Sequence, residues 1–395
     1  MKQYKKVIKS ALERPRIDTH THIPDEYVNP GNKKPGTLPN LEEASLADQR
    51  VIAEGCRILY GINPGTFIRK DSPKFSILLE KSKRFTQDIR KAYRTAFDKA
   101  RIVTQLAFCN HHPESLKVKR LSERMELIGY VDEPIAGNDR VFCPDGKDMD
   151  FNYFESLCGH FGKLNSFDGY LDALDKMVDM WKKSGVKAIK TAFAYTIGLS
   201  FSDPAYKYAV RAFSRKTKMT FDQIRTVQDY AFRHCLLACK RNGLPVVIHT
   251  GFQIWGHSNL SQSNPLLLHN LLVDKKTRGL TFVLLHGGNP YTGEMTYLAS
   301  MFPNVMLDFT WIAWMSRTRF RSAFADWLEM VPKEKFCWGS DSTNVESIVG
   351  IDYTVRHLIA ETLNESINRG LIDEQYALEF IEDCYYNNPK RIFNL

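Results

Sequence analysis

The sequence lacks the features that define several broad classes of protein. No uncharged apolar run reaches the ~18 residues needed to cross a bilayer, and no apolar signal-peptide core follows the charged N-terminus. No segment is so poor in apolar residues that long disorder is expected, and no internal repeat or low-complexity tract interrupts the chain. The sequence therefore predicts a globular, cytoplasmic protein that makes no contact with a membrane.

Several cofactor and nucleophile motifs are also missing. The chain has no phosphate-cradling Walker loop, no dinucleotide-binding fingerprint and no nucleophile elbow of a serine hydrolase. The eight cysteines are dispersed from Cys56 to Cys384, and the nearest pair, Cys235 and Cys239, has no second pair that would complete a zinc knuckle. We expect these cysteines to be reduced and mostly buried.

The net charge of +9 raises the question of nucleic-acid binding. The basic residues are scattered, however, and the densest run, from Lys182 to Lys190, is interrupted by apolar positions that belong to a core pattern. Such an excess favours solubility more than it identifies a partner. The sequence thus predicts a small-molecule substrate and no nucleic-acid partner, and it leaves a homo-oligomeric state open.

What the sequence does contain is a regular alternation of strand and helix patterns. Eight short β-branched or apolar runs predict strands, and amphipathic stretches predict helices between them. This alternation predicts one α/β domain over residues 1–395, a (β/α)8 TIM barrel. The predicted strands are 16–19, 101–108, 125–130, 186–193, 245–249, 280–286, 304–309 and 335–339, and the predicted helices include 168–183, 221–242, 265–275, 292–301, 323–331 and 345–370.

Two stretches exceed what a minimal barrel needs. Residues 29–93, after the first strand, begin with a loop rich in proline and glycine and continue as helical material, and residues 195–220 add a second helical insertion after the fourth strand. Segments that follow barrel strands lie at the end of the barrel where active sites form. We expect both insertions to roof an active site.

Polar residues follow several of the predicted strands. His20 and His22 are two residues apart, so in an extended strand both imidazoles point to the same side and can reach one cation. His249 ends the fifth strand, His286 ends the sixth, and Asp341 follows the eighth. Because barrel enzymes assemble their sites at the carboxyl ends of strands, these residues predict a joint metal site.

The types of these side chains also indicate the metal. Imidazole and carboxylate groups suit zinc and similar divalent cations, and an open coordination position lowers the pKa of a bound water to near 7. We therefore expect one Zn²⁺ per chain and activation of water as the default chemistry.

Longer segments resemble the amidohydrolase superfamily of metal-dependent barrels. The segments 248–252, 284–291 and 339–341 are similar to its amidohydrolase-related branch. That branch contains mononuclear zinc decarboxylases, lactonases and other hydrolases, and the amidohydrolase-like domains attached to some glutamine-synthetase-like proteins. The resemblance is strong from about residue 186 to residue 344 and also covers His20 and His22.

The resemblance implies a role for each of the strand-end residues. His20, His22, His249 and Asp341 would hold the metal, and His286 would be a further ligand or an acid/base beside the metal-bound water. Asp341 would also accept a proton from that water and pass it to the leaving group. The long helical stretch between the fourth and fifth strands is in addition similar to that of uronate isomerases.

Lys190, near the end of the fourth strand, resembles the strand-four lysine of the family. In binuclear members this lysine is carbamylated and bridges two metals, whereas an unmodified ammonium group cannot ligate a metal. An unmodified Lys190 would instead bind an anionic substrate or pair with a structural carboxylate. We favour the substrate anchor, which predicts a carboxylate-bearing substrate. Tyr195 and His111, just beyond the fourth and second strands, are further candidates for contact with the substrate.

These observations predict a metal-dependent hydrolase. Activated water would attack an amide, lactone or related carbonyl carbon while Asp341 and His286 move protons. Two alternatives use the same residues without hydrolysis: a decarboxylase in which His286 protonates the carbon as carbon dioxide leaves, and a uronate-isomerase-like enzyme. An inactive barrel is disfavoured by the complete set of metal ligands, and a nucleic-acid-binding protein by the scattered basic residues.

Overall fold

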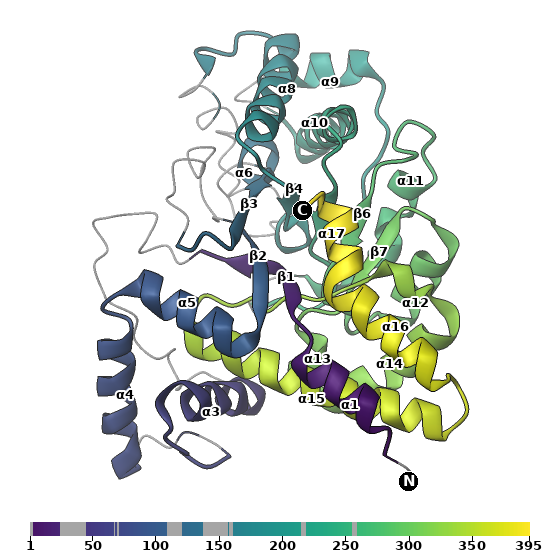
Figure 1. Ribbon diagram of the computed structural model, residues 1–395. Helices are drawn as coiled ribbons and strands as arrows, with labels where there is room; N and C mark the ends of the chain where they lie inside the picture. Colours follow the sequence, from purple (N-terminus) through teal and green to yellow (C-terminus); the bar gives the residue numbers. More distant parts are fainter. Residues whose placement is uncertain are drawn as a thin grey trace. The chain divides into compact units, whose positions relative to one another are not determined.

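Figure 1 shows a computed structural model of the chain. The structure describes residues 3–23, 45–66, 68, 71–108, 121–136, 157, 161–214, 219–254 and 259–395. His111 and the first part of the predicted insertion 29–93, up to residue 44, lie outside the described residues.

Eight strands form one sheet in which they follow one another in chain order, as the sequence predicts. The pairs with a described register, β1 with β2 and the successive pairs from β3 to β7, are all parallel. With helices between successive strands, the fold is an α/β fold of the (β/α)8 barrel type. The strands are β1 (Arg16–His22), β2 (Ile102–Phe108), β3 (Met125–Tyr130), β4 (Ala188–Thr191), β5 (Val246–Ile248), β6 (Phe282–Leu284), β7 (Val305–Asp308) and β8 (Phe336–Cys337).

Helices occupy most of the chain between these strands. Among the described residues, α3, α4 and α5 lie between β1 and β2, and α9 and α10 lie between β4 and β5. The α-helices are α1 (Lys5–Glu13), α3 (Leu46–Tyr60), α4 (Pro73–Phe85), α5 (Ile89–Ala100), α6 (Asp132–Ala136), α8 (Phe167–Lys183), α9 (Tyr206–Phe213), α10 (Phe221–Arg241), α11 (His269–Leu272), α12 (Thr292–Met301), α13 (Ile312–Met315), α14 (Arg317–Met330), α15 (Val345–Asn368), α16 (Glu374–Glu382) and α17 (Asn388–Phe393). The shorter turns are η2 (Phe193–Tyr195), η3 (Leu260–Ser263), η4 (Pro265–Leu268), η5 (His286–Gly288), η6 (Lys333–Lys335) and η7 (Asp383–Asn387).

Two predicted helices differ from the structure. The helix predicted at 323–331 begins earlier, at Arg317, because the side chain of Ser316 caps it by accepting a hydrogen bond from a backbone N–H of the first turn. The helix predicted at 265–275 starts instead as the 3-10 turn η4, capped by the Asn264 side chain, and continues only as the short α11. In the first case a local capping interaction sets the boundary, and hydrophobic periodicity does not detect it. In the second case the predicted start at residue 265 is confirmed, and the difference lies in the 3-10 geometry and the earlier end at Leu272.

The chain divides into two compact units, which we describe separately. Unit 1 comprises Met1–Cys109, Val118–Glu126 and Asp308–Leu395. Within it, α3 and α1 both pack against α15 (Figure 1). Unit 2 comprises Asn110–Lys117 and Leu127–Leu307, and within it α10 packs against α8 and α9. A single domain with roofing insertions at 29–93 and 195–220 stays a prediction.

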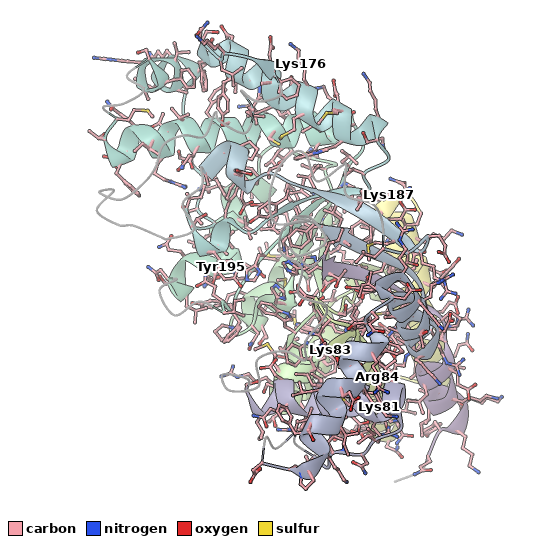
Figure 2. All side chains as sticks on the ribbon, turned by 90° about the vertical axis from the view of Figure 1, so that its left-hand side faces the viewer. Lys81, Lys83, Arg84, Lys176, Lys187 and Tyr195 are labelled. Atoms are coloured by element: carbon pink, nitrogen blue, oxygen red, sulfur yellow. The ribbon has the colours of Figure 1, made fainter. Side chains whose placement is uncertain are left out.

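Unit 2 buries the side chains that the sequence pattern places inward. On α8, Leu174, Met177 and Trp181 recur at three- and four-residue spacing, and all three are fully buried. The four residues of β4 are buried as well. Lys187 precedes β4 and Tyr195 follows it, so the two residues mark opposite ends of this strand in Figure 2.

Three further expectations concern cysteines, surface charge and membranes. Basic side chains on α4, namely Lys81, Lys83 and Arg84, are exposed and contribute to a solvated surface (Figure 2). In the part of the chain that the structure describes, no helix is long and apolar enough to cross a membrane. The described cysteines are buried and free of disulfide bonds, as predicted: Cys56, Cys235, Cys239, Cys337 and Cys384.

Candidate active site

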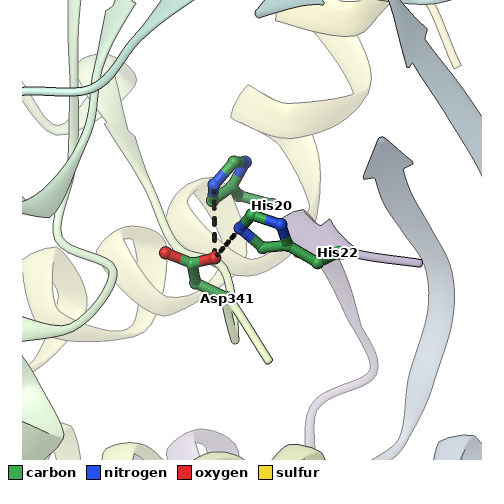
Figure 3. A group of neighbouring side chains, drawn as sticks. All are labelled: His20, His22 and Asp341. Atoms are coloured by element: carbon green, nitrogen blue, oxygen red, sulfur yellow. Dashed lines mark ion pairs between the residues drawn. The ribbon is translucent and has the colours of Figure 1, made fainter. Parts of the chain in front are cut away.

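Three of the four predicted metal ligands come together in unit 1. His20 and His22 lie on β1, and Asp341 lies in the loop after β8. Nε2 of His22 is 2.9 Å and Nε2 of His20 is 3.4 Å from the same carboxylate oxygen, Oδ1 of Asp341 (Figure 3). Because the two histidines are two residues apart on a strand, both imidazoles point to the same side.

This cluster fits a divalent metal ion. One potential ligand atom from each of the three residues lies within 4.8 Å of the other two. Imidazole nitrogen and carboxylate oxygen are ligands that zinc prefers. The side chains of His20 and Asp341 are 1% and 2% exposed, whereas that of His22 is 25% exposed, so the cluster is accessible on the His22 side. A buried group of this kind with one accessible side can hold a metal and admit water or substrate.

A buried carboxylate fixes the loop that carries Asp341. Asp18 on β1 accepts hydrogen bonds from the Ser340 hydroxyl at 2.6 Å, the Ser340 backbone N–H at 2.8 Å and the Gln105 amide at 2.8 Å. Burial raises the pKa of Asp18 to about 6, against the lowering effect of these hydrogen bonds. The backbone N–H of Asp341 in turn donates to the carbonyl of His20 at 2.8 Å. The sequence prediction missed Asp18, although it shares a strand face with His20.

Two other predicted residues, His249 and His286, are hydrogen bonded to each other in unit 2. Nε2 of His286 lies 2.9 Å from Nδ1 of His249, and Nε2 of His249 lies 2.8 Å from the carbonyl oxygen of Phe252. Because a carbonyl can only accept, Nε2 of His249 carries a hydrogen, and Nδ1 of a neutral ring then accepts the hydrogen on Nε2 of His286. A metal bound through either nitrogen of His249 would replace one of these hydrogen bonds.

Tyr195 joins this histidine pair. Its ring centroid lies 4.5 Å from that of His249, and its hydroxyl accepts a hydrogen bond from the backbone N–H of Ile254 at 3.4 Å. The side chain is 7% exposed. Tyr195 is therefore held beside His249, a predicted metal ligand, whereas His111, the other predicted substrate contact, lies outside the described residues.

Backbone conformation also distinguishes the predicted catalytic residues. His286 has φ 66°, Asp341 has φ 45°, and Trp311 has φ 70°, and each follows a strand of the sheet. Residues with side chains rarely adopt this left-handed region, and the cost, about 1–3 kcal/mol each, is typically found at functional sites. Two of the three residues are the ones that the sequence predicts to move protons. None of them is glycine, so the sequence does not indicate these conformations.

Lys190 has a buried carboxyl group near it, which the sequence prediction did not identify. Lys190 on β4 is 1% exposed, and Asp132 at the start of α6 is 6% exposed. Burial raises the pKa of Asp132 to about 7, although hydrogen bonds from the Thr191 side chain and the Ala192 backbone N–H, together with the charge of Lys190, lower it. Near neutral pH this carboxyl is therefore only partly ionised.

The raised pKa of Asp132 predicts a pH-dependent contribution to stability. The pKa of this carboxyl is about 7 in the folded protein, against an ordinary value of 3.8. Because the folded state binds the proton more tightly, the carboxyl stabilises the fold fully below pH 3.8, and this stabilisation is lost as the pH rises through 7. Asparagine does not ionise. We therefore expect the free energy of unfolding of the wild-type protein to fall, relative to Asp132→Asn, by roughly 2–4 kcal/mol between about pH 4 and pH 8.

Urea unfolding at a series of pH values measures this difference. Asp172→Asn, at an exposed position on α8, is the matched control and should differ from the wild type by a constant amount at all pH values. A stability difference for Asp132→Asn that does not change with pH would show that the carboxyl is ionised throughout.

Comparison with known proteins relates this chain to one curated protein and to several solved structures. Over 225 residues it is 27% identical to Protein fluG of Emericella nidulans, an alignment that covers 53% of this chain and 26% of that protein. The chain thus spans about a quarter of the length of this relative.

Solved structures are similar over nearly the whole chain. A protein from Lactobacillus casei described as a metal-dependent hydrolase has a TM-score of 0.70 at 17% identity, with 98% of this chain and 97% of that chain covered. Glucuronate isomerase from Caulobacter crescentus has a TM-score of 0.73 at 14% identity, with 99% and 93% covered, and uronate isomerase from Thermotoga maritima has a TM-score of 0.72 at 14% identity, with 98% and 96% covered. At these identities the likeness shows a shared fold. A family model described as amidohydrolase matches residues 122–395, well over half of the sequence, and the chain therefore belongs to the amidohydrolase family.

Proposed function

We propose that this protein is a metal-dependent hydrolase that uses water to cleave an amide, lactone or related carbonyl group of a small carboxylate-bearing substrate. The convergence of His20, His22 and Asp341 on one point, in a chain of the amidohydrolase family, carries the proposal. Two imidazoles and a carboxylate at these distances are ligands for a catalytic divalent metal. The absence of a phosphate-cradling or dinucleotide motif in the sequence supports hydrolysis over cofactor chemistry.

Zinc is the metal we propose, with one ion per chain. His20, His22 and Asp341 hold it, and His249 at the carboxyl end of β5 is the fourth ligand in this proposal. A nitrogen of His249 becomes available to the metal when the metal replaces the hydrogen bond that this nitrogen forms with Phe252 or with His286. The bound metal supplies polarisation of a carbonyl group and a water with a lowered pKa.

Two side chains move protons in this proposal. One carboxylate oxygen of Asp341, Oδ1, faces the two histidines. The second carboxylate oxygen can therefore accept a proton while Oδ1 remains beside the two imidazoles. His286 is held by its hydrogen bond to Nδ1 of His249, and a neutral imidazole can accept or return a proton near neutral pH. The left-handed backbone of both residues supports a role that requires fixed orientation.

Lys190 and Tyr195 bind the substrate in this proposal. The ammonium group of Lys190 is buried, and its nearby carboxyl, Asp132, is only partly ionised near neutral pH. A buried ammonium group binds an anion more strongly than an exposed one does. We therefore prefer the substrate-anchor role of Lys190 to a purely structural ion pair and to a carbamylated bridge between two metals.

Isomerisation of a uronate is the second candidate. The helical stretch that contains α9 and α10, between β4 and β5, favours it, and the similarity of this chain to two uronate isomerases supports a common fold. The same two proton-moving residues would then transfer a proton between neighbouring carbons of the sugar acid. Decarboxylation of a carboxylate substrate is a further reaction of the same groups.

The origin of the oxygen in the product distinguishes these reactions. We expect the zinc-loaded protein, screened against lactones, N-acyl amino acids, uronates and aromatic carboxylates in ¹⁸O-labelled water, to release a product that carries ¹⁸O in its new carboxyl group. Mass spectrometry of the products measures this. Release of carbon dioxide, or conversion of an aldose to a ketose of equal mass without ¹⁸O in its carboxyl group, would contradict hydrolysis and support the decarboxylase or the isomerase.

A further inference from the structure

Unit 1 contains a cavity that the proposed reaction does not use. It measures about 650 Å³, which is within the usual range for small-molecule sites. It lies where α3 packs against α15, next to the start of α14 and the turn after α3. Its lining is mostly polar and includes Arg50, Glu54, Arg57, Asn63, Arg317 and Tyr353. We call it the α3–α15 cavity.

The charges that line this cavity are predominantly positive. Three arginines face one carboxylate, Glu54. Nε of Arg57 donates to Glu54 at 2.8 Å, and the Arg57 guanidinium lies over the Tyr353 ring, 5.1 Å from its centroid, so this arginine is already fixed in place. Arg50 and Arg317 form no ion pair with a carboxylate of the described residues. The cavity therefore carries an excess of two positive charges, which favours an anion with more than one negative charge.

Arg50 lines the cavity. Its Nε is buried, so an anion in the cavity would contact the outer nitrogens of the guanidinium group instead. Guanidinium groups match the oxygens of a phosphate in pairs.

A smaller cavity of about 220 Å³ adjoins the first one. The two share Glu54, Arg317 and Tyr353, and the smaller one also includes His357 and Glu361. The rings of Tyr353 and His357 lie 4.0 Å apart at the junction. A ligand with a phosphate group beside the arginines would have room there for an uncharged polar part.

The α3–α15 cavity is separate from the metal cluster in unit 1. Asp341 lies just before α15, which begins at Val345, and Tyr353 is eight residues further along that helix. At ~1.5 Å per residue, Tyr353 is about 12 Å along the helix axis from the end near Asp341. A ligand that binds beside Tyr353 therefore does not coordinate the metal.

We propose that the α3–α15 cavity is a second binding site, which takes a phosphate-bearing small molecule through Arg50, Arg57 and Arg317. The observations that carry it are the arginine-rich lining, the excess of positive charge and the adjoining space beside Tyr353. The site is independent of the reaction proposed for the metal cluster.

Titration of the zinc-loaded, full-length protein tests this proposal. Isothermal calorimetry and thermal unfolding are measured with inorganic phosphate and with glycerol 3-phosphate, and with sodium chloride at the same ionic strength. We expect glycerol 3-phosphate to bind with a Kd below about 1 mM, more tightly than inorganic phosphate, and to raise Tm where sodium chloride does not. The double variant Arg50→Gln/Arg317→Gln should weaken binding at least about tenfold.

The matched control is Arg90→Gln/Arg319→Gln, which removes the same charge from exposed positions of α5 and α14 that line neither cavity. It should bind as the wild type does. Equal weakening in both double variants, or no binding by the wild type, would overturn the proposal. Tighter binding of inorganic phosphate than of glycerol 3-phosphate would overturn the assignment to a phosphorylated molecule. Binding that persists in His20→Ala separates this site from the metal cluster.

Discussion

Asp341→Asn is expected to abolish both metal binding and turnover. Asp341 supplies the oxygen that lies 2.9 Å from His22 and 3.4 Å from His20, so it is the residue that joins the two imidazoles. Asparagine keeps the size of the side chain but removes its charge and its ability to accept a proton. Loss of the proton-transfer step alone reduces kcat by about 10²–10⁴-fold, and loss of the metal would remove the remaining activity.

Two measurements test this prediction. The first is the metal content per chain, determined by mass spectrometry after zinc loading, and the second is the reaction rate with the substrate found by screening. The matched control is Asp326→Asn, at an exposed position of α14, which should bind one zinc and keep full activity. His20→Ala should behave like Asp341→Asn. A variant that loses its metal but retains activity would disprove the proposed function, whereas an unchanged metal content would disprove the ligand assignment. Circular dichroism verifies that both variants fold.

Gly350→Ala is expected to destabilise the protein by about 3 kcal/mol, through overpacking between two helices. α3 and α15 pack so closely that a Cβ on Gly350 would lie 1.7 Å from the carbonyl oxygen of Val51. On the other helix, a Cβ on Gly55 would lie 1.9 Å from the carbonyl oxygen of Glu346. Because both obstacles are backbone atoms, rotation of a side chain cannot relieve the clash, and the helices must move apart.

Denaturant unfolding measures this loss, and a fall in Tm of several degrees should accompany it. Gly293→Ala is the matched control, because a Cβ on Gly293, in the first turn of α12, meets no atom within 4 Å. Alanine favours a helix over glycine, so the control should be as stable as the wild type or slightly more stable. Equal stability of Gly350→Ala and the wild type would show that the two helices can separate at no cost.

Local sequence patterns predict much of the fold and of the candidate site. Most strands are visible as short apolar runs, and a polar residue at the carboxyl end of such a run needs no long-range information to be recognised. The two-residue spacing of His20 and His22 was sufficient to predict that both face one point, where Asp341 also lies. The starts of most helices were predicted to within one residue, whereas the start of α14 at Arg317 was missed because the side chain of Ser316 caps it.

Other parts of the site depend on residues far apart in the sequence. Asp18 is hydrogen bonded to Ser340 across 322 positions, and Asp132 acquires a pKa of about 7 because the folded chain buries it, although the nearby Lys190 lowers this pKa. The left-handed conformations of His286 and Asp341 likewise follow from the surrounding structure. The sequence by itself determined which side chains end the strands, since strand periodicity is local. Only the tertiary structure decided their partners, their backbone strain and their proton affinity, because burial and hydrogen bonding between distant segments set all three.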